Sequence, residues 1–114
     1  MIEKLSKYIP KNSIELVQEI LENHHIDIKI VNNRATKHGD FKRLLNGSFQ
    51  ITLNKGLNEY QFLITLIHEI AHFVTHKKYN RVKPHGIEWK RTFQHLMLPF
   101  IQPLIFPNDL LPIV

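Results

Sequence analysis

The strongest helical pattern in the chain covers residues 58–76 and is apolar on most of its circumference. Its apolar positions recur at helical spacings of three and four, and they are Phe62, Leu63, Leu66, Ile67, Ile70, Ala71, Phe73 and Val74. Asn58, with Gln61 three positions later, resembles a capping box and predicts where this helix begins. A helix that is apolar on so many sides must lie inside the fold, covered by other elements. Polar side chains along it therefore need a specific reason to be there.

Two shorter amphipathic patterns predict further helices at about residues 13–25 and 87–97. Asn12, with Glu15 three positions later, is the predicted N-cap of the first helix. The second helix would bury Trp89, Phe93, Leu96 and Met97. Residues 98–114 contain four prolines and cannot form one regular helix. Because this stretch is apolar, we expect it to pack on the body as an extended, Pro-rich C-terminal arm.

Two segments, residues 26–31 and 49–53, alternate between apolar and polar side chains as strands do. The dipeptide Asn46-Gly47 precedes the second segment and predicts a hairpin there. We expect a type I′ turn, because both residue types tolerate a positive φ. The combined pattern predicts an α+β fold, in which a small mixed or antiparallel sheet packs on the central helix and other helices flank it.

The composition is that of one globular domain over residues 1–114. Of these residues, 43% are apolar and 22% are charged, which is ordinary for a folded, soluble chain. No apolar run approaches the roughly 20 residues that span a bilayer, and the N-terminus lacks the pattern of a signal peptide. We therefore expect a cytoplasmic protein without a membrane partner. Because cysteine is absent, disulfides, thiolate-bound zinc and a thiol nucleophile are excluded.

The net charge of +5 is concentrated in two basic segments, residues 34–43 and 77–91. The first has four basic residues against Asp40, and the second has six against Glu88. Such asymmetry is typical of proteins with an anionic partner, nucleic acid first among them. A solvated lysine-rich surface explains the same pattern equally well.

Polar residues interrupt the central helix in the run His68-Glu69-Ile70-Ala71-His72. Residues at i and i+4 lie on the same face of a helix, so both imidazoles can reach one metal ion. Glu69 lies about 100° around the helix from His68, where it can hold and deprotonate a metal-bound water. Zinc is the expected metal, because its catalytic sites combine three protein ligands with a water. The alternative is a pair of core histidines whose ring nitrogens bind backbone groups.

A third ligand must come from another part of the chain. His76 lies about 12 Å along the helix axis from His68, which is too far to share one ion. His85 follows His72 by thirteen residues, beyond a loop and just before the next predicted helix. The chain can fold back over that distance, so His85 is the better candidate.

The His-Glu-x-x-His run over 68–72, followed past a basic loop by His-Gly-Ile-Glu-Trp over 85–89, resembles the SprT-like zinc metallopeptidase domain family. This group includes the DNA–protein crosslink protease Spartan. The stretches 34–41 and 49–54 are similar to the Gly-containing hairpin that precedes the active-site helix of the family. The resemblance covers about residues 13–98, and the two-part histidine motif is its most specific component.

The resemblance implies a compact zincin-like α+β fold with zinc held by His68, His72 and His85. It also implies that Glu69 is the general base. Members of the family often continue into a C-terminal zinc ribbon or DNA-binding segments. This chain has no cysteine and stops at Val114, so that part is either absent or left off the sequence, which weakens the expectation of nucleic-acid targeting but not that of the metal site.

We therefore expect a zinc-dependent metalloendopeptidase that acts on a protein or peptide substrate. Zinc would polarise the scissile carbonyl, while Glu69 would remove a proton from the zinc-bound water and pass it to the leaving amine. The edge of strand 49–53 is the expected place for an extended substrate to pair. His76 and Tyr79 are both candidates for stabilising the oxyanion.

Two alternatives stay open from the sequence. The domain could be a basic nucleic-acid-associated module with a structural zinc and no protease activity. It could also be a protease that DNA stimulates on DNA-associated or crosslinked proteins, and the basic loop 77–83 beside the site is the feature that suggests this. The oligomeric state is open as well.

Overall fold

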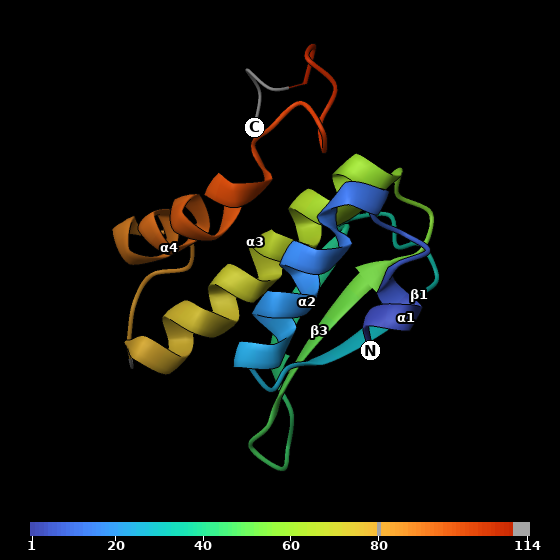
Figure 1. Cartoon of the computed structure of the whole chain (residues 1–114). Coiled ribbons are helices and arrows are strands. Elements are labelled where there is room, and N and C mark those ends of the chain that lie inside the picture. Colours follow the sequence, from blue (N-terminus) through green and yellow to red (C-terminus); the bar gives the residue numbers. More distant parts are fainter. Residues whose placement is uncertain (80, 111–114) are drawn as a thin grey trace.

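The computed structural model describes residues 1–79 and 81–110 (Figure 1). Its elements, in chain order, are α1 (Ile2–Leu5), η1 (Lys11–Ser13), α2 (Ile14–Asn23), β1 (Asp27–Val31), β2 (Gly39–Arg43), β3 (Phe49–Asn54), α3 (Glu59–Lys78), α4 (Ile87–Met97) and η2 (Leu98–Phe100). The predicted α+β class, with a small mixed sheet and several helices, is confirmed. Among the described residues, no helix is both long enough and apolar enough to cross a membrane.

The three strands are arranged in the order β1-β3-β2. β1 runs parallel to β3 and β2 runs antiparallel to it, so that Ile51 of β3 lies opposite Ile28 on one side and Phe41 on the other. Both sides of β3 are therefore occupied by neighbouring strands. The expectation that a substrate pairs with the edge of residues 49–53 is wrong, because the strand edge nearest α3 belongs to β2.

The β2–β3 hairpin turns at Asn46 and Gly47 as predicted, but with a different turn type. The Leu44 N–H donates to the Ser48 carbonyl at 2.7 Å, and the Gly47 N–H donates to the Leu44 carbonyl at 2.9 Å. Only Gly47 has a positive φ, +88°, in this loop. The loop is thus a three-residue connection with a left-handed glycine, and a two-residue type I′ turn is not formed.

Helix α3 packs against β2 and β3 on one side and against α4 on another (Figure 1). It begins as predicted, because the Asn58 side chain accepts a hydrogen bond from the Gln61 N–H at 2.9 Å. Phe62, Leu63, Leu66, Ile67 and Ile70 are fully buried along it. This helix therefore carries the core, and its polar residues sit where the surrounding elements approach it.

The predicted cap at Asn12 is wrong. Residues 11–13 form a short 3-10 turn, and α2 begins at Ile14 without a side-chain cap. The Asn12 amide instead donates to the Leu104 carbonyl at 2.8 Å, on the C-terminal segment. This hydrogen bond to a distant segment replaces the predicted N-cap interaction of Asn12.

The C-terminal segment packs on the body, but it is not extended. Residues 98–110 form η2 and a series of turns, and Phe100, Ile105 and Phe106 are buried in the core. Pro99 lies in the first turn of η2, where proline is tolerated, and the spaced prolines prevent one continuous helix without requiring an extended arm. Residues 111–114 of the predicted arm lie outside the described part of the chain.

Candidate metal centre

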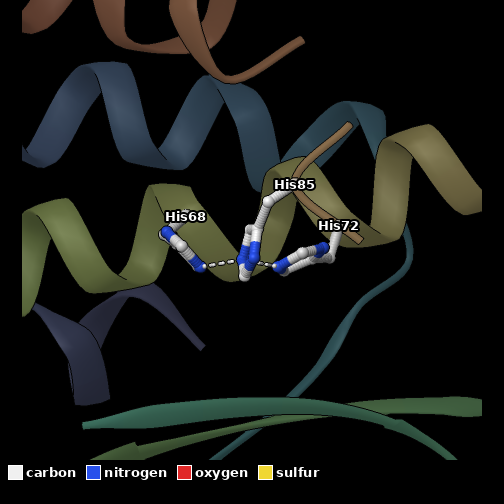
Figure 2. Close-up of side chains that lie close together, drawn as sticks. All are labelled: His68, His72 and His85. Carbon is white, nitrogen blue, oxygen red and sulfur yellow. Dashed lines mark hydrogen bonds between the residues drawn. The ribbon is translucent and has the colours of Figure 1, made fainter. Parts of the chain in front are cut away.

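Three histidines from two parts of the chain meet above the sheet (Figure 2). His68 and His72 project from one side of α3, and His85 enters between them from the loop before α4. The His85 Nε2 atom lies 3.0 Å from that of His72 and 3.1 Å from that of His68. One ring nitrogen from each residue lies within 4.8 Å of the other two. The structure thus brings together the three residues that the sequence singles out.

His76 does not join this cluster. Its ring packs against Phe49, with ring centroids 4.8 Å apart, and against Phe41 at 6.1 Å. Its position therefore agrees with the estimate from helix geometry that His76 is too far from His68 to share one metal ion.

The contacts among the three Nε2 atoms cannot all be hydrogen bonds. A neutral imidazole nitrogen carries either one hydrogen or one lone pair, so the single Nε2 of His85 cannot bond well to two others at once. A metal ion, however, accepts one lone pair from each ring. Zn–N bonds of about 2.05 Å at tetrahedral angles place ligand nitrogens roughly 3.3 Å apart. The two separations from His85, 3.0 and 3.1 Å, are close to that spacing, and the third pair of nitrogens lies within 4.8 Å.

Burial keeps two of the rings in the form that binds a metal. It lowers the pKa of His68, and the nearby His85 lowers it further. Burial also lowers the pKa of His72 to about 4, with smaller contributions from His68 and His85. Both rings are therefore neutral at neutral pH, as metal coordination requires.

Trp89 forms a wall behind the three histidines. Its ring centroid lies 4.7, 5.1 and 4.6 Å from those of His68, His72 and His85. Its indole N–H donates to the His68 carbonyl at 3.3 Å, which joins α4 to α3 at this point. Phe41 of β2 lies nearly parallel to the His72 ring, at 6.2 Å and 12°. Aromatic packing from both neighbours thus orients the imidazoles, a role that helical periodicity alone does not reveal.

His85 has a left-handed backbone, with φ of 60°, which is uncommon for a residue other than glycine. The turn is closed by the Gly86 N–H, which donates to the Lys83 carbonyl at 2.9 Å. This conformation costs roughly 1 kcal/mol. The left-handed backbone directs the His85 imidazole toward α3. The contacts of this imidazole with the other residues of the centre must offset the conformational cost.

Glu69 lies beside the histidines and is nearly buried, with 7% of its surface exposed. It shares with all three histidines a cavity of about 400 Å³ that is closed on the other side by β2. Burial, with a smaller contribution from Asp40, raises the pKa of Glu69 to about 7, although Arg34 and Lys37 oppose the shift. A carboxyl group with a pKa near neutrality can both accept and return a proton.

Gly39 lets the beginning of β2 approach Glu69 closely. A Cβ atom at this position would lie 2.8 Å from Thr65 Cγ2, 3.1 Å from Glu69 Oε2 and 3.2 Å from Glu69 Cγ. The distance to Thr65 Cγ2 is shorter than any comfortable carbon–carbon contact. The sequence shows Gly39 only as part of a Gly-containing turn. Its approach to Glu69 could not be predicted, because the two residues are thirty positions apart in the chain.

Gly39→Ala is therefore expected to displace the Glu69 carboxylate without removing a metal ligand. Misplacement of a catalytic group by about 1 Å can cost on the order of 10²-fold in rate. We expect peptide hydrolysis to fall by about tenfold or more while the zinc content of the purified protein stays the same. Adding Thr65→Ser removes the methyl group at 2.8 Å and should restore part of the loss. A Gly39→Ala protein with the parental rate would show that β2 accommodates the extra methyl group.

Trp89 is the only tryptophan of the chain, so its fluorescence reports on this centre. Co²⁺ in the histidine cluster is expected to quench most of the emission and to saturate at one equivalent, because a metal with a partly filled d shell quenches a nearby indole. Zn²⁺ has a filled d shell, so zinc added first should prevent the quenching. Quenching that persists in a His85→Asn protein would place the bound cobalt elsewhere.

The chain is similar to known proteins of one family. A family model described as SprT-like matches residues 5–102. Protein SprT of Yersinia enterocolitica (serotype O:8 / biotype 1B) is 37% identical over 54 residues, which are 44% of this chain and 32% of that protein. Protein SprT of Vibrio atlanticus is 47% identical over 45 residues, which are 36% of this chain and 27% of that protein. The matches span only about a third of the length of these curated relatives. Because the family match covers most of its residues, the chain belongs to the SprT-like family.

Proposed function

We propose that this chain is a zincin-like, zinc-dependent metalloendopeptidase domain. His68, His72 and His85 are the proposed zinc ligands, and Glu69 is the proposed general base. The observation that carries the proposal is the approach of three Nε2 atoms within a cavity that the nearly buried Glu69 also lines.

The donor set suits zinc, and it suits a catalytic site better than a structural one. Imidazole nitrogen is a good ligand for Zn²⁺, and three protein ligands leave a coordination position open. Structural zinc sites have four protein ligands, whereas the cluster within the described residues has three. When bound there, zinc would lower the pKa of a coordinated water to about 7 and polarise a substrate carbonyl.

Glu69 has the properties that the proton transfers require. Its carboxylate accepts the proton of the attacking water and then donates it to the leaving amine. Burial raises the pKa of Glu69 above the usual value of a carboxyl group, which favours its holding a proton between these two transfers. The absence of a side chain at Gly39 leaves room for this carboxylate in the cavity that it shares with the histidines.

An extended substrate has a suitable edge to pair with in β2. This strand is last in the order β1-β3-β2, and Gly39, Asp40 and Phe41 line the cavity that holds the histidines. Main-chain hydrogen bonds to the outer side of β2 would hold a peptide across the metal centre. The scissile peptide bond would then lie at the metal centre, beside Glu69.

The direct test combines metal analysis with proteolysis of a denatured protein. We expect one zinc per chain, cleavage of the substrate, loss of cleavage with a chelator, and recovery on addition of Zn²⁺. A protein that holds one zinc and cleaves no denatured substrate would contradict the proposal. It would favour a binding domain with a structural metal.

Stimulation by DNA is a second candidate property. Lys77, Lys78, Arg81, Lys83, Lys90 and Arg91 are all exposed. The segment 34–43 contributes less, because Arg34 donates to Thr52 and Asn54 and Lys37 pairs with Asp40 at 3.3 Å. If the exposed set contacts DNA, single-stranded DNA should raise the rate of proteolysis at low salt and lose its effect at high salt. Tight, salt-sensitive binding without any proteolysis would favour the nucleic-acid-binding alternative.

A further inference from the structure

A second cavity, of about 240 Å³, lies on the His72 side of the metal centre. It is formed by β2, α3, the loop 81–84 and Trp89 of α4. Phe41, His72 and Pro84 line both this cavity and the one that contains Glu69. The two spaces are therefore neighbours that share walls. A ligand that occupies the centre can extend one group into the second cavity.

The walls of this cavity are aromatic, and its polar groups are basic. Phe41 and the nearly buried Trp89 form apolar walls, while Arg81 and Lys83 line it from the exposed loop. No acidic side chain lines it, and within the described residues neither Arg81 nor Lys83 has an ion-pair partner. An anionic group is the natural complement to such a lining.

Thr75 adds a second polar feature to the lining. This residue is 2% exposed, and its hydroxyl has no hydrogen-bond partner in the described part of the chain. A buried hydroxyl without a partner costs about 1–3 kcal/mol. Thr75 thus places a hydroxyl without a partner within the wall of the cavity.

We propose that this cavity binds the side chain of an acidic substrate residue next to the scissile bond. The inference rests on the proposed peptidase function and names its substrate class. A peptide paired along β2 places successive side chains about 3.3 Å apart on alternating sides. When its scissile bond lies at the metal centre, a neighbouring side chain enters the cavity beside His72. The methylene groups of a glutamate fit between Phe41 and Trp89, and its carboxylate meets Arg81 and Lys83.

Size and shape favour a peptide side chain over nucleic acid at this place. The volume of about 240 Å³ suits one side chain between two aromatic rings. A phosphodiester backbone would be expected to follow the exposed lysines of α3 and α4 outside the cavity. Binding of an acidic peptide side chain and binding of nucleic acid therefore lead to different expected results in one binding experiment.

The experiment measures peptide binding without cleavage, on Glu69→Gln protein loaded with zinc. Two sets of fluorescent peptides carry a single Glu or a single Lys at each successive position of one alanine-rich sequence. We expect a position at which the Glu peptide binds at least tenfold more tightly than the Lys peptide. Arg81→Gln/Lys83→Gln should remove this preference, and Arg81→Glu/Lys83→Glu should reverse it. Lys29→Glu, on the far strand β1, is the control and should keep it.

The possible results separate this inference from the proposed function. Equal affinity for both peptide sets would overturn the inference. Binding of single-stranded DNA that depends on Arg81 and Lys83, without a preference for Glu peptides, would overturn it as well. Cleavage of the same peptides by the unmodified protein tests the peptidase proposal separately. If the protein cleaves the peptides without preferring acidic ones, only the proposal that the second cavity binds an acidic side chain is refuted. If it prefers acidic peptides but cleaves none, only the proposed peptidase function is refuted.

Discussion

Glu69→Gln is expected to lower the rate of peptide hydrolysis at saturating substrate by about 10²–10⁴-fold. The amide has nearly the same size and still fits the space beside Gly39, but it cannot accept a proton from water. Because Glu69 lies outside the cluster of ligand nitrogens, the bound zinc should not change. The measurement is kcat on a denatured substrate together with the zinc content of the same preparation.

The matched control for this substitution is Glu59→Gln, in the first turn of the same helix α3. Glu59 is exposed and does not line the cavity of the histidines. Its replacement should leave both the rate and the zinc content unchanged. If Glu69→Gln keeps its zinc and cleaves as fast as the parent, Glu69 is not the general base.

His85→Asn is expected to weaken zinc binding more than any other change in the loop before α4. Replacing partners that only orient metal ligands typically costs about 10–100-fold in metal affinity. Removal of a ligand should exceed that range, and hydrolysis should be lost with the metal. Asparagine tolerates the left-handed backbone at this position, so the loop keeps its conformation. Zinc affinity is measured by competition with a chromogenic chelator.

The control here is His76→Ala, one helical turn beyond His72 and outside the cluster. It should keep the parental zinc affinity. Circular dichroism should show that both variants remain folded, since His76 and His85 are exposed and leave the core intact. A His85→Asn protein with unchanged zinc affinity would require a different third ligand.

Local features of the fold were predictable because they depend on residues close together in the chain. The Asn58 cap, the length of α3 and the position of the β2–β3 turn follow from periodicity and from side-chain-to-backbone bonds three residues apart. The same predictions failed where a distant segment competes. Asn12 satisfies the Leu104 carbonyl and leaves α2 uncapped, and the C-terminal segment coils into turns that bury Phe106.

The order of the strands in the sheet also could not be predicted from local sequence patterns. Alternation predicts that residues 49–54 form a strand, but it does not show which strands flank them. The structure has β3 in the centre, so the sheet edges belong to β1 and β2, and it is β2 that lines the cavity of the histidines. This arrangement changes the expected position of a substrate, and it brings Phe41 against His72.

For this protein, the sequence alone determined that His68 and His72 share one face of a buried helix, because an i, i+4 relation is a local property of the helix backbone. It also made His85 the best candidate for the third position, through the length of the loop. The distances between the three rings, the room that Gly39 leaves for a nearly buried Glu69, and the basic, aromatic cavity beside His72 depend on the packing of the folded chain. These features arise where β2, α3 and the loop before α4 pack together. The spacing of residues within one segment does not predict how that segment packs against another that is distant in the chain.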